Sequence, residues 1–181
     1  MSSWSRVAKR TRVPLGFLFA IAYLWLAQPT PASIIAGGCV AMAGVLLRAL
    51  ASGHITKNAA LTTTGPYAVT RNPLYVGSII IALGFAIAAR SPWVVVALML
   101  LFVLVYLPVV RSEEAYLHSR FPEFADYSRR VPRFFPRLTN LRNITQGFSS
   151  ERYFGHREYN ALLGSAAMIV ALILKFLAPW R

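Results

Sequence analysis

The sequence predicts an all-α integral membrane protein, a helical bundle of about five transmembrane helices with a cytosolic segment that covers the inner helix ends. Apolar residues make up 56% of the 181 residues and charged residues only 14%, whereas soluble domains carry roughly 25% charged residues. The apolar residues gather in five runs, and the net charge of +13 lies beside these runs. This placement indicates a lipid bilayer as the neighbour. The single cysteine, Cys39, excludes an internal disulfide framework.

Five segments are predicted to span the membrane. A spanning helix needs about 20 apolar residues, with a range of about 17–25, and its backbone groups must be paired internally, which favours helices. Short turns at residues 28–31 and 90–92 join the first span to the second and the third to the fourth, so each pair is expected to form an antiparallel hairpin. The spans are residues 13–27, 31–50, 73–89, 92–110 and 161–178.

The positive residues predict the orientation of the bundle. Four basic residues precede the first span, and nine arginines lie between the fourth and fifth spans, whereas the two short turns carry only Arg90. The N-terminus and the functional face are therefore expected in the cytoplasm, at the inner membrane if the cell is bacterial. The first 32 residues also resemble a signal peptide, with a basic start and an apolar run. Because another apolar run follows at once, we interpret them as a span.

Two polar stretches, residues 51–72 and 111–160, leave the predicted bilayer on the same side, so their side chains can meet. We expect residues 1–137 to form a core of four spans with a cytosolic cap. Residues 138–181 are expected to form an extension that carries the fifth span.

The third span begins with a candidate anion site. Asn72 and Pro73 are typical of a helix start, and the free N–H groups there, beside Arg71, suit a carboxylate. An ordinary helix cap with an arginine near lipid phosphate is the alternative. Tyr67 and Tyr75 flank this point, either as interface anchors or as ring faces for a cationic ligand.

Glu113 and Glu114 follow the fourth span and are the first acidic residues of the chain. Adjacent helical residues point about 100° apart, so we expect one carboxylate to meet Arg111 or another loop cation. The other carboxylate is then free to accept a hydrogen bond from a ligand ammonium group. The alternative is a solvated helix end. The spacing of Glu114 and His118 is weak support for a metal, since no third ligand is near, and His54 is expected either to bind a ligand or to cap its helix.

Residues 118–137 alternate aromatic residues with arginines. Such a stretch can lie on anionic lipid head groups or fold over the helix ends. Nucleic-acid binding uses the same residue types, but the five apolar spans argue against it.

These motifs together resemble the isoprenylcysteine carboxyl methyltransferase family, and more loosely the related phospholipid methyltransferases. The similarity covers about residues 53–136. The motifs that carry it are Gly65-x-Tyr67, Arg71-x-Pro73-x-Tyr75-x-Gly77, Glu113-Glu114 and Tyr127 with the following Val131-Pro132.

The resemblance implies an integral-membrane enzyme that transfers a methyl group from S-adenosyl-L-methionine to a lipophilic acceptor and releases S-adenosyl-L-homocysteine. The cofactor would sit at the cytosolic helix ends, enclosed by the segment after the glutamate pair, and the acceptor would enter sideways from the bilayer. By position, the resemblance implies catalytic roles for Arg71, Glu113 and Tyr75. It implies cofactor binding by His54, Gly65, Tyr67, Arg71, Pro73, Tyr75, Glu113, Glu114 and Tyr127, with no metal.

Two features depart from the family pattern. Asn72 stands where the prenylcysteine enzymes usually have histidine, so the acceptor is left open among the carboxylate, amine or thiol of a small isoprenoid or lipid. The fifth span lies beyond the family core and is a candidate contact for an oligomer. A non-catalytic membrane protein of the same fold, which binds lipid or assists assembly, is the main alternative. The absence of acidic residues from the predicted spans argues against a proton-coupled transporter.

Overall fold

The computed structural model describes residues 18–56, 60–136 and 144–178, most of which are helical, with no strand among them. Residues 18–26 form an N-terminal helix. The elements that follow are α2 (Pro31–His54), η1 (Gly65–Ala68), α3 (Pro73–Ala89), α4 (Pro92–Leu101), η2 (Phe102–Tyr106), α5 (Leu107–Arg120), α6 (Phe124–Arg130), α7 (Ser150–Gly155) and α8 (Tyr159–Leu177). The predicted all-α helical membrane bundle is confirmed.

Three helical stretches are long and apolar enough to cross a membrane: Pro31–His54, Pro92–Arg120 and Tyr159–Leu177. A fourth apolar helix, α3, has 17 residues and corresponds to the third predicted span. Of the first predicted span, residues 13–17 lie outside the described residues, and residues 18–26 are helical. The protein is therefore a membrane protein with helices where the sequence predicts spans.

The helix starts follow local sequence signals. Thr30 caps α2 through a capping box, in which the Thr30 side chain accepts from the Ser33 backbone N–H while the Ser33 side chain accepts from the Thr30 backbone N–H. Proline stands at the first position of α2, α3 and α4, where its missing N–H costs nothing. These caps place the short turns where the sequence predicts them.

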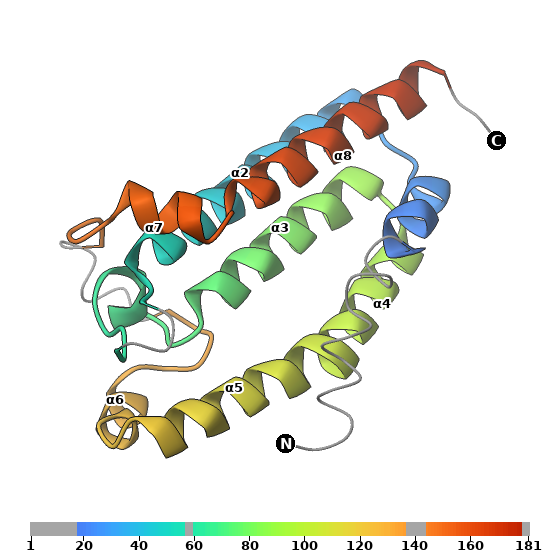
Figure 1. The fold of residues 1–181 in the computed structure, drawn as a ribbon. Coiled ribbons are helices and arrows are strands. Elements are labelled where there is room, and N and C mark those ends of the chain that lie inside the picture. The colour runs from blue at the N-terminus through green and yellow to red at the C-terminus, as the bar shows by residue number, and fades with distance from the viewer. Residues whose placement is uncertain (1–17, 57–59, 137–143, 179–181) are drawn as a thin grey trace.

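The fourth span is longer than predicted, because α4, η2 and α5 form one continuous helical stretch that runs well past Val110 to Arg120 (Figure 1). Its middle part, η2, is a π-helical turn. Pro108, the second residue after this turn, has no N–H to donate to the carbonyl four residues back, and its ring would clash with that carbonyl in a regular helix. The wider turn relieves this conflict, and α5 carries the glutamate pair beyond the apolar part of the helix.

Helices α2 and α3 pack closely along their length (Figure 1), and glycines make this approach possible. A methyl group at Gly84 would lie 2.5 Å from the Ala41 backbone nitrogen and 2.5 Å from the Gly37 carbonyl oxygen. These are backbone atoms, so neither can move aside without shifting a helix.

We therefore expect Gly84→Ala to destabilise the protein by about 1–3 kcal/mol through overpacking. Gly164→Ala is the matched control, because nothing lies within 4 Å of a methyl group there, and alanine is the better helix former by about 0.5–1 kcal/mol. Thermal unfolding in detergent measures both. Equal midpoints for the two variants would contradict the close contact between α2 and α3.

The C-terminal helices α7 and α8 lie along α2 (Figure 1). At the far end of α8, the Lys175 ammonium donates to the backbone carbonyls of Leu24 and Trp25. These carbonyls end the N-terminal helix and carry the negative end of its dipole, so a lysine there is stabilising. The C-terminal helix thus contacts both α2 and the N-terminal helix.

Helix α4 approaches α3 where the short turn joins them, and α5 then diverges from α3 (Figure 1). At the polar end of the bundle, α6 folds back beside the end of α5 (Figure 1). The polar ends of α2, α3 and α5 therefore face a common space, which holds the candidate site.

Candidate functional site

A cavity of about 1490 Å³ lies at this polar end. Its lining comes from α2 and the loop after it, from η1 and the start of α3, from η2, α5 and α6, and from the turn before α8. The predicted site residues that line it are Tyr67, Arg71, Tyr75, Glu113, Glu114 and Tyr127. The expectation that the two distant polar stretches meet is confirmed.

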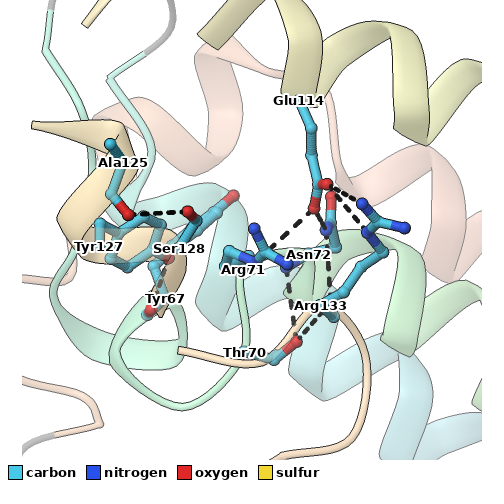
Figure 2. Close-up of polar contacts among 9 residues, drawn as sticks. All are labelled: Tyr67, Thr70, Arg71, Asn72, Glu114, Ala125, Tyr127, Ser128 and Arg133. Carbon is cyan, nitrogen blue, oxygen red and sulfur yellow. Dashed lines mark hydrogen bonds and ion pairs between the residues drawn. The ribbon is translucent and has the colours of Figure 1, made fainter. Parts of the chain in front are cut away.

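Glu114 is the centre of a charged junction at one wall of the cavity (Figure 2). The residue is only 7% exposed. Its Oε2 accepts from Arg133 Nε at 2.8 Å and lies 2.6 Å from Arg133 Nη2. Its Oε1 lies 3.7 Å from Arg71 Nε, within reach of an ion pair but too far for a hydrogen bond. A buried carboxylate is costly unless paired, and two arginines meet that requirement here.

Asn72 connects this junction to the start of α3. It stands at the N-cap position, but its side chain makes no capping bond to the helix backbone. Its amide Nδ2 donates instead to Glu114 Oε1 at 2.9 Å and to the Arg133 carbonyl at 3.3 Å (Figure 2). The Thr70 hydroxyl donates to the same carbonyl at 3.0 Å, and the Arg71 backbone N–H donates to the Pro132 carbonyl at 2.9 Å. The segment after α6 is therefore held against the start of α3.

The two adjacent glutamates have different surroundings, as the sequence predicts. Glu114 faces Arg71 and Arg133, so the predicted loop cations are these two rather than Arg111. Glu113 is half-buried and lines the cavity. Among the residues that the structure describes, none forms a hydrogen bond or ion pair with its carboxylate. Glu113 is thus the carboxylate available to a ligand.

Two tyrosines fix the loop that carries η1. The Tyr127 hydroxyl donates to the Tyr67 carbonyl at 2.7 Å (Figure 2), so α6 is fastened to η1. The Tyr67 hydroxyl is buried and has no hydrogen-bond partner within the described part of the chain. Burial raises the pKa of the Tyr67 hydroxyl above its ordinary value, and the nearby acids Glu158 and Glu113 raise it further. Tyr67 therefore stays a neutral hydrogen-bond donor at physiological pH.

Tyr75 lies on the apolar side of the cavity. Its ring contacts the ring of Tyr106 edge to face, with centroids 6.2 Å apart. Leu74, Tyr106 and Pro108 add apolar surface to the same cavity. The cavity thus combines a charged part and an apolar part.

Three of the predicted cofactor residues do not line the cavity: His54, Gly65 and Pro73. His54 is 3% exposed, and its ring nitrogens lie 2.7 Å from the Leu50 carbonyl and 3.0 Å from the Gln146 carbonyl. Gly65 has a φ of 58°, and a methyl group there would lie 2.4 Å from the His54 ring. These residues shape the loop under the cavity, and their assignment to cofactor binding stays a prediction.

The described residues contain no group of three or more His, Cys, Asp or Glu that could hold a metal ion. Both oxygens of Glu114 contact cationic or amide groups. The His118 ring packs against Phe124, with centroids 6.0 Å apart. The spacing of Glu114 and His118 therefore has a structural explanation without a metal.

Three charged residues at this site were missed by the sequence reasoning: Arg133, Arg48 and Glu158. Arg133 lies in a stretch rich in arginines, and nothing in the sequence distinguishes it from its neighbours. Arg48 stands near the end of the second predicted span, where its positive charge alone gives no sign of a specific partner. Glu158 lies far along the chain from Arg48, and only the fold reveals that they meet.

Comparison with known protein families agrees with this geometry. The model of the phospholipid methyltransferase family matches residues 32–123, half of the chain. The chain belongs to this family. The matched region contains α2 from its second residue, η1, α3, α4, η2 and all of α5, and therefore every cavity wall except those from α6 and the turn before α8.

Two curated relatives of this phospholipid methyltransferase family member are metal-resistance proteins. The cobalt-zinc-cadmium resistance protein CzcN of Cupriavidus metallidurans is 48% identical over 86 residues, which cover 48% of this chain and 40% of the relative. The nickel-cobalt-cadmium resistance protein NccN of Alcaligenes xylosoxydans xylosoxydans is 45% identical over 87 residues, covering 48% of this chain and 41% of the relative. The match thus spans less than half of either relative. No solved structure matches the chain.

Proposed function

We propose that this protein transfers a methyl group from S-adenosyl-L-methionine to a lipophilic acceptor at the cytosolic interface of the membrane. One observation carries the proposal. A single cavity at the ends of apolar helices contains both an available carboxylate, Glu113, and the junction of Glu114 with its arginines. Membership of the phospholipid methyltransferase family supports the reaction class.

The residues of the cavity fit the proposed cofactor. S-adenosyl-L-methionine carries an ammonium group, a carboxylate and a sulfonium, and when bound it supplies the electrophilic methyl group. Glu113 suits the ammonium group, and Arg71, whose Nε makes no hydrogen bond among the described residues, suits the carboxylate. The rings of Tyr67 and Tyr75 suit a cation. The protein then acts mainly by holding the two reactants in line and by excluding water.

The apolar part of the cavity suits the acceptor. Tyr106 and Pro108 lie on the long apolar stretch Pro92–Arg120, and Leu74 lies on the apolar helix α3, so a lipophilic molecule can approach from the bilayer. An acceptor carboxylate is already ionised, whereas an amine or a thiol must first lose a proton. The positive charges of the chain support a cytoplasmic position for this face and for the N-terminus, in the inner membrane if the cell is bacterial.

A second candidate is a non-catalytic member of the family that binds a lipid or assists assembly. The names of the two relatives, which refer to metal resistance and not to methyl transfer, favour this candidate. It predicts a folded membrane protein whose cavity takes no part in methyl transfer.

Cofactor binding tests the proposal directly. Calorimetry on the detergent-purified protein should show saturable binding of S-adenosyl-L-homocysteine. Incubation with methyl-labelled cofactor and a lipid extract from the source cell should then place label in a lipid-soluble product. A folded sample that does not bind would overturn the proposal, and binding without labelled product would favour the non-catalytic candidate.

A further inference from the structure

An ion pair joins the C-terminal segment to the family core at the wall of the cavity. Arg48 of α2 and Glu158, the residue before α8, both line the cavity. Arg48 Nη2 lies 2.7 Å from Glu158 Oε1, and Arg48 Nε donates to Glu158 Oε2 at 3.1 Å. This two-point geometry is the strong form of an arginine–carboxylate contact. Their side chains are 23% and 13% exposed, so water screens the pair only partly.

Arg48 continues this link to the start of α3. Its Nη1 donates to the Ser78 hydroxyl at 2.5 Å and to the Leu74 carbonyl at 3.3 Å. The Ser78 hydroxyl donates in turn to the Leu74 carbonyl at 3.0 Å. Leu74 is the residue before Tyr75 and follows Arg71 by less than one helical turn. One guanidinium therefore contacts Glu158 and the helical turn that presents the proposed site residues.

Gly77 explains how the arginine fits. A methyl group at Gly77 would lie 2.6 Å from Arg48 Cγ and 2.8 Å from the Gly44 carbonyl oxygen. The glycine of the Arg71-x-Pro73-x-Tyr75-x-Gly77 motif thus leaves room for the Arg48 side chain across α3. The same glycine also allows the close approach of the α2 backbone at Gly44.

Glu158 is held in place by a constrained turn. The preceding residue, Arg157, has a φ of 55°, a left-handed conformation that costs a residue with a Cβ roughly 1 kcal/mol or more. On the other side of this turn, His156 Nδ1 lies 3.1 Å from the Ser52 carbonyl. The turn is therefore attached to α2 at two points, through His156 and through Glu158. These two contacts stabilise the strained conformation of Arg157 between them.

We infer that Arg48 and Glu158 form a positioning unit through which the segment beyond the family core orients the first turns of α3. The inference rests on the proposed function. Glu158 fixes the direction of the Arg48 guanidinium, and Arg48 fixes Leu74 and Ser78. These contacts hold Arg71 and Tyr75 at the geometry that the cofactor requires. Neither Arg48 nor Glu158 needs to touch the cofactor in this role.

The first test is Glu158→Gln, with S-adenosyl-L-homocysteine binding measured by calorimetry well below the unfolding midpoint. The dissociation constant should rise about tenfold, which corresponds to ~1.4 kcal/mol. Ser78→Ala removes one contact of Arg48 without disturbing the ion pair and should weaken binding about threefold, the value of one modest hydrogen bond. Glu151→Gln, which changes an exposed acid on α7, is the matched control and should bind as the unmodified protein does.

The charge swap Arg48→Glu with Glu158→Arg separates positioning from simple stabilisation. The swap restores an ion pair between α2 and the turn before α8, so the unfolding midpoint should recover relative to Glu158→Gln. The carboxylate at position 48 cannot donate to Leu74 or Ser78, so the weak binding should persist. Recovery of binding by the swap would overturn the inference.

Other outcomes are equally decisive. Unchanged affinity in both Glu158→Gln and Ser78→Ala would overturn the inference, and Ser78→Ala alone decides it if the charge variants do not fold. Failure of the proposed function gives a different result: the unmodified protein itself then binds no S-adenosyl-L-homocysteine. Failure of the inference alone leaves the unmodified protein binding, with the variants binding equally well.

Discussion

Replacement of Glu114 by alanine is expected to lower the free energy of unfolding by about 3 kcal/mol. The carboxylate accepts hydrogen bonds from Asn72 and Arg133 and pairs with Arg71. Its removal leaves the Arg71 guanidinium, whose side chain is only 14% exposed, without a counter-charge. Arg133 is 40% exposed and turns to water more easily, which keeps the loss below the highest values for buried pairs. Thermal or denaturant unfolding of the detergent-purified protein measures the change.

The matched control for this variant is Glu123→Ala. Glu123 is an exposed acid in the same region, and its side chain makes no capping bond to α6. Its replacement should change stability by no more than about 0.5 kcal/mol. Equal stability of the two variants would show that the Glu114 junction contributes nothing to the fold.

The neighbouring replacement, Glu113→Gln, is expected to weaken ligand binding and to leave stability unchanged. The unfolding midpoint should stay unchanged, because none of the described residues pairs with this carboxylate. The dissociation constant for S-adenosyl-L-homocysteine should rise about 10- to 100-fold, since a charge-assisted hydrogen bond contributes about 1.5–3 kcal/mol. Calorimetry on the folded variant measures this change.

Gln is nearly the same size as Glu, so the substitution removes the charge and leaves the shape of the cavity. A variant that binds as tightly as the unmodified protein would exclude Glu113 as the partner of the ligand ammonium. A variant that loses stability and keeps its affinity would show that Glu113 has a structural role and no role in binding.

The helices and their approximate limits were predictable because the signals are local. Proline at the first helical position, apolar runs of sufficient length and short turns between them are read directly from neighbouring residues. The limits of α3 agree with the predicted span. The π-helical turn η2 was not predicted, since the effect of Pro108 depends on how the helix is supported around it. The helix was expected to continue past Val110 through the glutamate pair, and α5 does so as far as Arg120.

The candidate site was predictable only in part. The angle between adjacent helical residues was enough to expect different surroundings for Glu113 and Glu114. Which cation would face Glu114 was not predictable, because Arg133 lies among many arginines and reaches the junction only after α6 folds back. The contact between Arg48 and Glu158 depends on α8 packing along α2, and the N-cap signal of Asn72 did not reveal that its side chain turns to Glu114.

The π-helical turn also determines the direction in which the side chains at the polar end of α5 point around the helix axis. A turn of this kind accommodates one additional residue while the side chains on either side keep their faces of the helix. In a regular helix, by contrast, one residue more or less rotates every residue beyond it by about 100°. Residues 102–106 are therefore the place where the fourth span can tolerate a change in length. Elsewhere along α4 or α5, such a change would turn Glu114 away from Arg71 and Arg133 and toward lipid or water.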